Sequence, residues 1–416
     1  MDELDRPIRH LSFFEALASL DEQDAEWRAT TAGLVVLRLV DAWLDEGAHV
    51  ASADAWGLSA VREAVDGMSP GDPARTILGG VVDAMAGAPR NDFALVAAPL
   101  MAYGRALNFD AKWRLAADVY ETLVANAHPI DEADVYIDAS MQLGYCSRMV
   151  GAWDRAAAAY AEAGRVATSV GDVVGILRAR IADARLSMSR GNLPRAEAIL
   201  DDTIERAKAE ALDDVAGLAL NERAALAHER REYEQSIRFA YEALSRVTGQ
   251  ATRDRVLADI AASFMELGVT SVARDAFLVL AATAQEQYVR WTSTLNLFDI
   301  AIREGSEPGF ELYRRQLARD ELPIALRAHY HIIAGKGYGA FSRPVQARRE
   351  LDQAIELSAS HRLNQLLFTA EESLRQLENG IAAQSIRAAK TEIPEVVADV
   401  AEAIRGMKAA VGAGGG

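Results

Sequence analysis

Residues 100–120 read LMAYGRALNFDAKWRLAADVY, and residues 140–160 read SMQLGYCSRMVGAWDRAAAAY. Each stretch carries a glycine, Gly104 or Gly144, nine residues before a tryptophan. An alanine follows each tryptophan three positions later, and a tyrosine stands four positions beyond that alanine. A pattern that returns after 40 residues indicates a repeat architecture, and the apolar spacing of three and four residues within it indicates amphipathic helices.

The register of these two stretches continues along most of the chain. Small or apolar residues recur at intervals of 40 residues and, after Ser236, of 37 residues: they are Ala116, Ala156, Ala196, Ser236, Ala273, Phe310 and Ala347. The sixth unit fits least well, because Arg314 stands where an apolar residue is expected. Strong helix formers dominate and only 11 prolines occur, so we expect an all-α chain of stacked helix pairs.

Composition and charge exclude several classes of protein. The 416 residues include 44 basic and 61 acidic side chains, and the net charge of −17 argues against direct binding of nucleic acid or of an anionic membrane. One cysteine, Cys146, excludes an intramolecular disulfide framework and a cysteine-rich zinc site. The acidic N-terminus shows no signal-peptide pattern and no apolar run is long enough to span a bilayer, so we expect a cytoplasmic protein.

The repeated positions resemble the signature of the tetratricopeptide repeat (TPR) family, with a small residue late in the first helix of a pair and a small-x3-aromatic pattern in the second. The resemblance is to the long-repeat bacterial type, because the units exceed the common length of about 34 residues and mostly lack the terminal proline. It implies a right-handed superhelical solenoid with helical caps, whose concave groove is lined by the first helix, helix A, of each pair. The second helix, helix B, then begins at Trp113, Trp153, Leu193 and Tyr233 in the first four units.

The flanks of the repeats lack this register. Three helical segments precede it, at residues 23–46, 53–66 and 74–86. We interpret them as an N-terminal cap or as degenerate repeats. The predicted organisation is therefore a helical cap over 1–90, seven TPR-like repeats over 91–360, a capping helix over 361–380, and a linker, a short amphipathic helix and a glycine-rich tail over 381–416.

The family's groove positions are carried over residue by residue onto helix A. They are positions two, five, nine, twelve and thirteen when the small residue is counted as position eight. The candidate ligand-groove residues are Arg105, Asn108, Met141, Tyr145, Arg148, Arg178, Arg185, Met188, Asn221, His228, Arg255 and Asp299. The resemblance implies that Asn221 and Asn108 hold the main chain of a bound peptide through their amides, which both donate and accept hydrogen bonds.

Two features of these positions favour a ligand groove. Basic residues outnumber acidic ones although the whole chain is acidic, and Met101, Met141, Met188 and Met265 recur there. Methionine adapts its shape to varied apolar partners. The alternative is structural, because arginines on a solenoid also pair with carboxylates of the next repeat and methionines also fill cores.

No catalytic constellation emerges from the sequence. Residues 334–337, AGKG, lack the spacing of a phosphate loop. His329 and His331 lie two residues apart, on different helix faces, so they cannot chelate one metal. The acidic pairs at 201–202 and 213–214 are interpreted as solvated helix ends or loops. We therefore expect no enzyme activity, no cofactor and no metal site.

The leading hypothesis is a non-enzymatic scaffold that binds a peptide or protein segment, acidic or ending in a carboxylate, in the concave groove. Arg148, Arg178, Arg185 and Arg255 would supply charge-assisted hydrogen bonds. The alternative is a peptide-sensing regulatory protein that changes superhelical shape on binding and signals to a partner. The change of repeat length after the fourth unit would mark its hinge. An enzyme formed by residues 1–90 is a third hypothesis without a motif to support it.

Overall fold

The computed structural model of the chain describes residues 9–44, 54–87, 92–361, 363–379 and 392–414. Every regular element within these ranges is a helix, which confirms the predicted all-α repeat fold. None of the described helices is both long enough and apolar enough to cross a membrane. The chain divides into two compact units, unit 1 over Met1–Gly191 and unit 2 over Asn192–Gly416.

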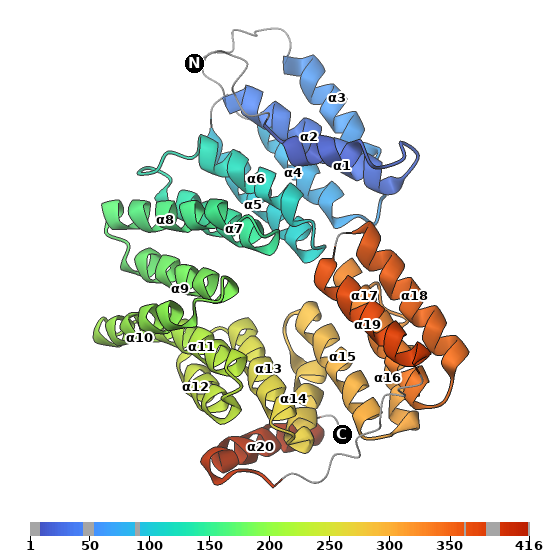
Figure 1. The fold of residues 1–416 in the computed structure, drawn as a ribbon. Helices are drawn as coiled ribbons and strands as arrows, with labels where there is room; N and C mark the ends of the chain where they lie inside the picture. The colour runs from blue at the N-terminus through green and yellow to red at the C-terminus, as the bar shows by residue number, and fades with distance from the viewer. Residues whose placement is uncertain (1–8, 45–53, 88–91, 362, 380–391, 415–416) are drawn as a thin grey trace. The chain divides into compact units, whose positions relative to one another are not determined.

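In unit 1, each helix from α5 onward packs on the helix that comes next in the chain. The helices that the structure describes in this unit are α1 (Leu11–Leu17), α2 (Ala25–Leu44), α3 (Asp54–Asp66), α4 (Pro73–Gly87), α5 (Phe93–Phe109), α6 (Trp113–Asn126), α7 (Ala133–Met149), α8 (Trp153–Val170) and α9 (Val173–Ser189). Helix B of the first two repeats begins at Trp113 and Trp153, as the register predicts (Figure 1). The third repeat has its helix A, α9, in unit 1 and its helix B in unit 2.

Two glycines let helix A approach helix B closely in unit 1. A Cβ atom at Gly104 would lie 2.6 Å from Cζ of Tyr120, and one at Gly144 would overlap the ring of Tyr160. Both tyrosine rings are buried. Each ring thus fills the space that the glycine leaves open.

The turn from helix A to helix B contains one left-handed residue in every repeat. Its φ lies between 59° and 84° at Ala111, Gly151, Gly191, Arg231, Gly268, Gly305 and Ser342. These positions follow the same intervals of 40 and 37 residues as the packing register. Glycine adopts this conformation without a steric penalty, whereas other residues are strained in it. The turn therefore keeps one backbone conformation even where its residue disfavours it.

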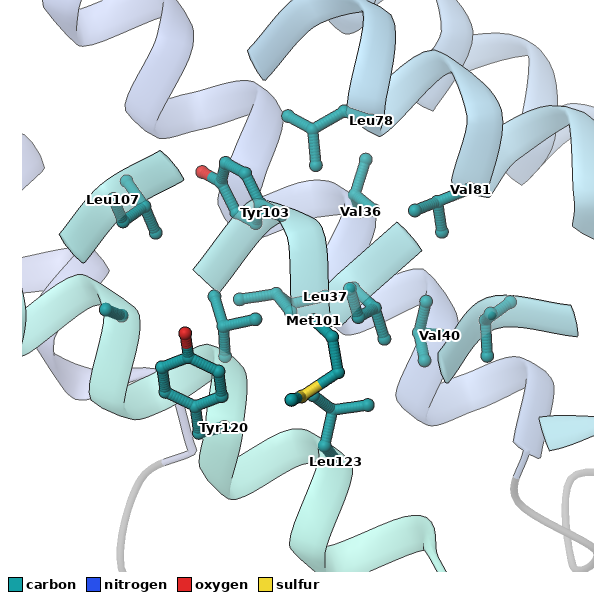
Figure 2. Packing of buried hydrophobic residues seen from close by; sticks show 14 of the residues in the cluster. Val36, Leu37, Val40, Leu78, Val81, Met101, Tyr103, Leu107, Tyr120 and Leu123 are labelled. Carbon is teal, nitrogen blue, oxygen red and sulfur yellow. The ribbon is translucent and has the colours of Figure 1, made fainter. Parts of the chain in front are cut away.

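The helices before the repeats share one hydrophobic core with them. Figure 2 shows this packing among Val36, Leu37 and Val40 of α2, Leu78 and Val81 of α4, Met101, Tyr103 and Leu107 of α5, and Tyr120 and Leu123 of α6. The predicted segments correspond to α2, α3 and α4, and residues 45, 46 and 53 of those segments lie outside the described residues. Helix α1 was not predicted.

Unit 2 continues the repeats and adds two C-terminal helices. Its described helices are α10 (Leu193–Ala209), α11 (Asp213–Glu229), α12 (Tyr233–Arg246), α13 (Gln250–Glu266), α14 (Thr270–Thr283), α15 (Gln287–Arg303), α16 (Glu307–Leu317), α17 (Ile324–Ala340), α18 (Pro344–Ser360), α19 (Asn364–Glu378) and α20 (Ala398–Gly414), with the 3-10 turn η2 (Glu395–Val397) before α20. Helix B begins at Leu193 and Tyr233 in α10 and α12, again as predicted.

The sixth repeat is irregular at the position that the sequence marks. Helix α16 has only 11 residues, and Arg314 pairs with Glu311 on the same helix at 2.9 Å. The ring of Phe310 stacks on Phe298 of α15 with 4.9 Å between centroids. Helix α15 also packs directly on α17, the helix A of the next repeat.

Two segments come after the last repeat. Helix α19 packs on α17 and α18, where a capping helix is expected. The predicted linker over 381–391 lies outside the described residues. Helix α20 lies against α14 and, with η2, against α12 (Figure 1). Residues 412–414 of the predicted glycine-rich tail form the end of α20.

Candidate functional site

The predicted groove positions occur on helix A of the repeats in both units. We define the unit 1 A-face as positions two, five, nine, twelve and thirteen of α5, α7 and α9, and the unit 2 A-face as the same positions of α11, α13, α15 and α17. Within unit 1, α7 contacts both α5 and α9. Eight of the candidate residues lie on the unit 1 A-face and four on the unit 2 A-face.

The unit 1 A-face carries an excess of positive charge. Its charged positions are the arginines Arg105, Arg148, Arg178 and Arg185 and a single carboxylate, Asp138. Arg178 donates to Asp138 at 3.1 Å, between α9 and α7, and the two side chains are 42% and 43% exposed. Arg105 is exposed and forms no ion pair with any residue that the structure describes. The five charged positions of this face therefore sum to a positive charge.

Aromatic side chains lie among these arginines. Tyr145 on α7 is 36% exposed and Phe109 on α5 is 44% exposed. The Arg148 guanidinium lies over the Tyr145 ring, 5.4 Å from its centroid, and donates to Ser189 Oγ of α9 at 3.4 Å. A cation over an aromatic ring is held in place while its N–H edges stay available to acceptors. The face thus offers charged donors beside apolar contact area.

Asn108 is used differently from the prediction. Its side-chain nitrogen donates to Tyr120 Oη at 3.3 Å and to Gln142 Oε1 at 3.5 Å, and its oxygen accepts from Cys146 Sγ at 3.0 Å. An amide has two donor hydrogens, and both are occupied here. The prediction that Asn108 holds a peptide main chain is therefore corrected, because its amide joins α5, α6 and α7.

The methionines at the predicted groove positions of unit 1 are buried or half-buried. Met188 is 4% exposed and Met101 is 7% exposed, and Figure 2 shows Met101 packed among the core residues of unit 1. Met141 is half-buried against Tyr160 and Leu186. The assignment of Met101 and Met188 to an open groove is wrong, since the packing of neighbouring helices covers both side chains.

A buried polar layer lies beneath the unit 1 A-face. Burial raises the pKa of the Cys146 thiol to about 12, so the sulfur remains protonated and donates to Asn108. Burial likewise raises the pKa of the Tyr120 and Tyr160 hydroxyls, while Arg148 acts in the opposite direction on Tyr160. A protonated, buried thiol is a poor nucleophile. The layer therefore contributes packing and hydrogen bonds.

The unit 2 A-face is balanced in charge. Its charged positions are Arg255, Arg303 and Lys336 against Glu229, Glu266 and Asp299. Arg255 forms a bidentate pair with Glu286 of unit 2, with a shorter contact of 2.5 Å. Asp299 accepts from Arg303 at 2.7 Å on the same helix. The structural alternative, in which arginines pair with carboxylates of a neighbouring helix, is confirmed for Arg255 here and for Arg178 in unit 1.

The other two candidates of unit 2 also bond within the unit. Asn221 on α11 donates to Asp259 Oδ2 on α13 at 2.9 Å, and its own Oδ1 is buried without a partner among the described residues. His228 Nδ1 lies 3.0 Å from Ser263 Oγ, and the imidazole packs edge-on against Tyr233 at 5.2 Å. The two hydrogen bonds join the adjacent A helices α11 and α13, and the ring contact joins α11 to helix B of its own repeat, α12. The ligand role predicted for both residues stays a prediction.

Sequence reasoning missed an ionic network around a buried arginine in unit 2. Arg223 on α11 is 8% exposed; it donates to Glu197 and, at 3.0 Å, to Asp201, both on α10. Arg230 also donates to Glu197, at 2.7 Å. Asp201 is 56% exposed, but it lies in the middle of α10, so its predicted location at a helix end or in a loop is wrong. The network holds α10 on α11, because a buried guanidinium needs carboxylate partners.

A polar recess in unit 1 was also missed, because no motif links its residues in the sequence. It has a volume of about 610 Å³ and is lined by Arg9, His10, Arg38, Asp41, Ala42, Ala125 and Asn126. The Asp41 carboxylate accepts from Arg9 and His10 at 2.9 Å each and from Asn126 at 3.2 Å. These bonds fasten the start of α1 to α2 and α6, so we interpret the cluster as an anchor.

Metal ligands are not gathered in the part of the chain that the structure describes. No group of three or more histidine, cysteine, aspartate or glutamate side chains there is arranged to hold a metal ion. His331 bonds Glu350 Oε2 at 2.7 Å through Nδ1.

Comparisons with known proteins give limited matches. No family model and no curated protein matches the chain. It is similar to the solved apo form of the quorum sensor NprR from B. thuringiensis, with 14% identity over 90% of this chain and 97% of that one and a TM-score of 0.42. It is also similar to BtubC (BKLC) from P. vanneervenii, with 13% identity over 54% of this chain and 86% of that one and a TM-score of 0.35. The repeat architecture therefore rests on this chain's own helix pairs and register.

Proposed function

We propose that this chain is a non-enzymatic binding protein whose unit 1 A-face takes an acidic peptide or protein segment. The observation that carries the proposal is the charge of that face. In a chain of net charge −17, four arginines beside a single carboxylate form a local surface that attracts a negatively charged partner and repels a positive one. Binding of this kind needs neither cofactor nor metal. The proposed setting is the bacterial cytoplasm.

The arginines have different roles in this proposal. Arg105 makes the first contact, because it is exposed and has no carboxylate partner among the described residues. Arg178 is held in place by Asp138 and offers its remaining N–H groups, since a guanidinium has five donors. Tyr145 and Phe109 supply apolar contact beside the charges, as aromatic anchors do in many protein interfaces.

The test compares matched positions of the two A-faces. Arg105 is position nine of α5 and Lys336 is position nine of α17. A partner captured from lysate by the unaltered chain is purified and titrated against Arg105→Glu and Lys336→Glu variants. Charge reversal at Arg105 is expected to weaken binding at least tenfold, or about 1.4 kcal/mol, and Lys336→Glu is expected to change it less than twofold. Equal affinities for both variants would contradict the assignment to unit 1.

Salt dependence provides a second readout of the same proposal. Ionic contacts with exposed arginines are screened as ionic strength rises, so affinity for the partner should fall steeply between low and physiological salt. The slope should be smaller for Arg105→Glu than for the unaltered chain. An affinity that does not depend on salt would mean that charge is not the basis of recognition.

A peptide-sensing regulator remains the second candidate, because it shares the binding step with a scaffold and differs only in the response to binding. The two are separated by titrating the chain with a short synthetic peptide cut from the partner's acidic segment. A scaffold should bind the peptide without a change in its other contacts. A sensor should gain or lose a second protein on peptide addition, as measured by co-purification.

A further inference from the structure

The outer faces of the B helices differ in one repeat of unit 2. One small or apolar residue recurs in every helix B, and we call the position just before it the outer position. Most B helices carry a polar, exposed side chain at the outer position: Arg155 on α8, Arg195 on α10, Gln235 on α12 and Gln346 on α18. Helix α14 carries Val272 there, which is 1% exposed. Ala276 and Val279, one and two turns further along the same stripe, are 0% and 8% exposed. The outer face of α14 is thus apolar and covered.

The covering element is α20, which lies against α14 (Figure 1). Val397 of η2 and Val400, Ala401 and Ile404 of α20 are buried, at the spacing of one helix stripe. Two ion pairs flank this stripe: Asp399 accepts from Arg238 of α12 at 2.8 and 2.9 Å, and Lys408 pairs with Asp275 of α14 at 2.5 Å. The stripe and the two pairs define both the position and the direction of the helix.

Unit 1 provides an internal comparison for this arrangement. Helix α6, a B helix of unit 1, also has an apolar residue just before its recurring small residue. This residue is Leu115, which is 8% exposed. Helices α1 and α2 contact α6, and Ser12 of α1 donates to Asp118 of α6 through its backbone N–H at 2.9 Å. An apolar outer stripe on a B helix therefore accompanies a helix that covers it in both units.

Helix α20 is a weak occupant of its site. Three of the four side chains in the buried stripe, Val397, Val400 and Ala401, are smaller than leucine and bury less apolar area. The Arg238 and Asp399 side chains are 49% and 59% exposed, so solvent screens their attraction. Gly406 stands in the middle of the helix and lowers its helical propensity.

We propose that the outer face of α14, together with Arg238 of α12, is a helix-binding site, and that α20 is its displaceable resident. The partner is an amphipathic helix of another protein with aliphatic residues at the spacing of 397, 400, 401 and 404 and with an acid and a base placed as Asp399 and Lys408 are. A second copy of α20 is disfavoured, because the same helix from another chain must compete with a resident that belongs to the same chain as the site. A helix with larger aliphatic residues and no glycine binds tighter and displaces α20. This surface is independent of the unit 1 A-face.

The first experiment titrates a fluorescent peptide of residues 392–411 against full-length variants. In Val400→Asp/Ile404→Asp the resident helix is unseated, and we expect this variant to bind the peptide at least 30-fold tighter than the unaltered chain. Adding Val272→Asp should abolish the binding, and a Gly406→Ala peptide should bind about fivefold tighter. No binding to the unseated variant, or equal binding after Val272→Asp, would overturn the proposal. Concentration-dependent dimerisation of the unaltered chain that Val272→Asp removes would overturn the choice of partner.

The second experiment uses the unaltered chain and does not depend on how the variants fold. Amide hydrogen exchange should be at least 100-fold faster in α20 than in α13, because a displaceable helix opens without global unfolding. Arg238→Glu should accelerate exchange in α20 further and leave α13 unchanged. Exchange in α20 as slow as in α13 would make α20 an integral part of the unit 2 core and would refute the proposal.

Discussion

In unit 1, the A-face positions hold four arginines and one carboxylate, whereas the equivalent positions of unit 2 hold three basic and three acidic residues. The repeat places these side chains at equivalent sites on equivalent helices, so the difference lies in their chemistry and not in the scaffold. Charges that are neutralised by a neighbouring helix hold repeats together. Arg105 of the unit 1 A-face forms no ion pair with a described residue, so its charge remains available to a partner.

The largest effect is expected where unit 2 uses charge for stability. Replacing both carboxylates around Arg223, Glu197→Ala with Asp201→Ala, should lower the free energy of unfolding by about 3–5 kcal/mol, because it leaves a buried guanidinium unpaired. Urea denaturation followed by circular dichroism measures the loss. The control is Glu286→Ala. Its partner Arg255 is 59% exposed, so this substitution should cost less than about 1 kcal/mol of unfolding free energy. Similar losses of unfolding free energy in both variants would mean that the burial of Arg223 does not make its ion pairs more important for stability than an exposed pair.

A smaller effect is expected where unit 1 depends on close packing. Gly104→Ala places a methyl group against the Tyr120 ring and should cost about 1–3 kcal/mol of unfolding free energy. The matched control is Gly80→Ala on α4, where no atom lies within 4 Å of the added Cβ. That change should stabilise the chain by about 0.5–1 kcal/mol, because alanine favours the helix over glycine. The two thermal unfolding midpoints should therefore move in opposite directions.

The smallest change in stability is expected for substitutions that test the charge difference between the two A-faces. Asp138→Asn removes the one carboxylate of the unit 1 A-face and should raise affinity for an acidic partner several-fold, with a stability change below about 1 kcal/mol. Asp299→Asn on the unit 2 A-face should leave partner affinity unchanged. Titration of the purified partner against both variants measures the difference. A loss of affinity in Asp138→Asn would show that Asp138 positions Arg178 more than it competes with the ligand.

The fold could be predicted because its determinants recur in the sequence. The spacing of Gly104, Trp113 and Tyr120 returns at Gly144, Trp153 and Tyr160, and each set produces the same close contact between two helices. Local contacts of this kind are encoded within about 40 residues. Hydrophobic packing then needs only the next repeat to complete it.

The site could be predicted only in part, because partners on adjacent helices decide whether a side chain is free. Asp138 precedes Arg178 by one repeat length, a signal in the register that would have identified this pair. The saturation of Asn108 required knowledge of which way Gln142 and Cys146 point. The docking of α20 on α14 joins residues 133 positions apart, outside any repeat spacing, although Val272 marks the surface that it covers.

The left-handed turns between helix A and helix B bear on how much change this chain tolerates. Ala111, Arg231 and Ser342 hold the turn conformation at φ of 59°, 61° and 61°, where other repeats have glycine. Each non-glycine residue there costs on the order of 1–2 kcal/mol. Substituting glycine should recover much of that strain, and neither proposed binding surface includes these residues. The scaffold can therefore tolerate destabilising substitutions that alter recognition, because stability gained at the turns compensates for them.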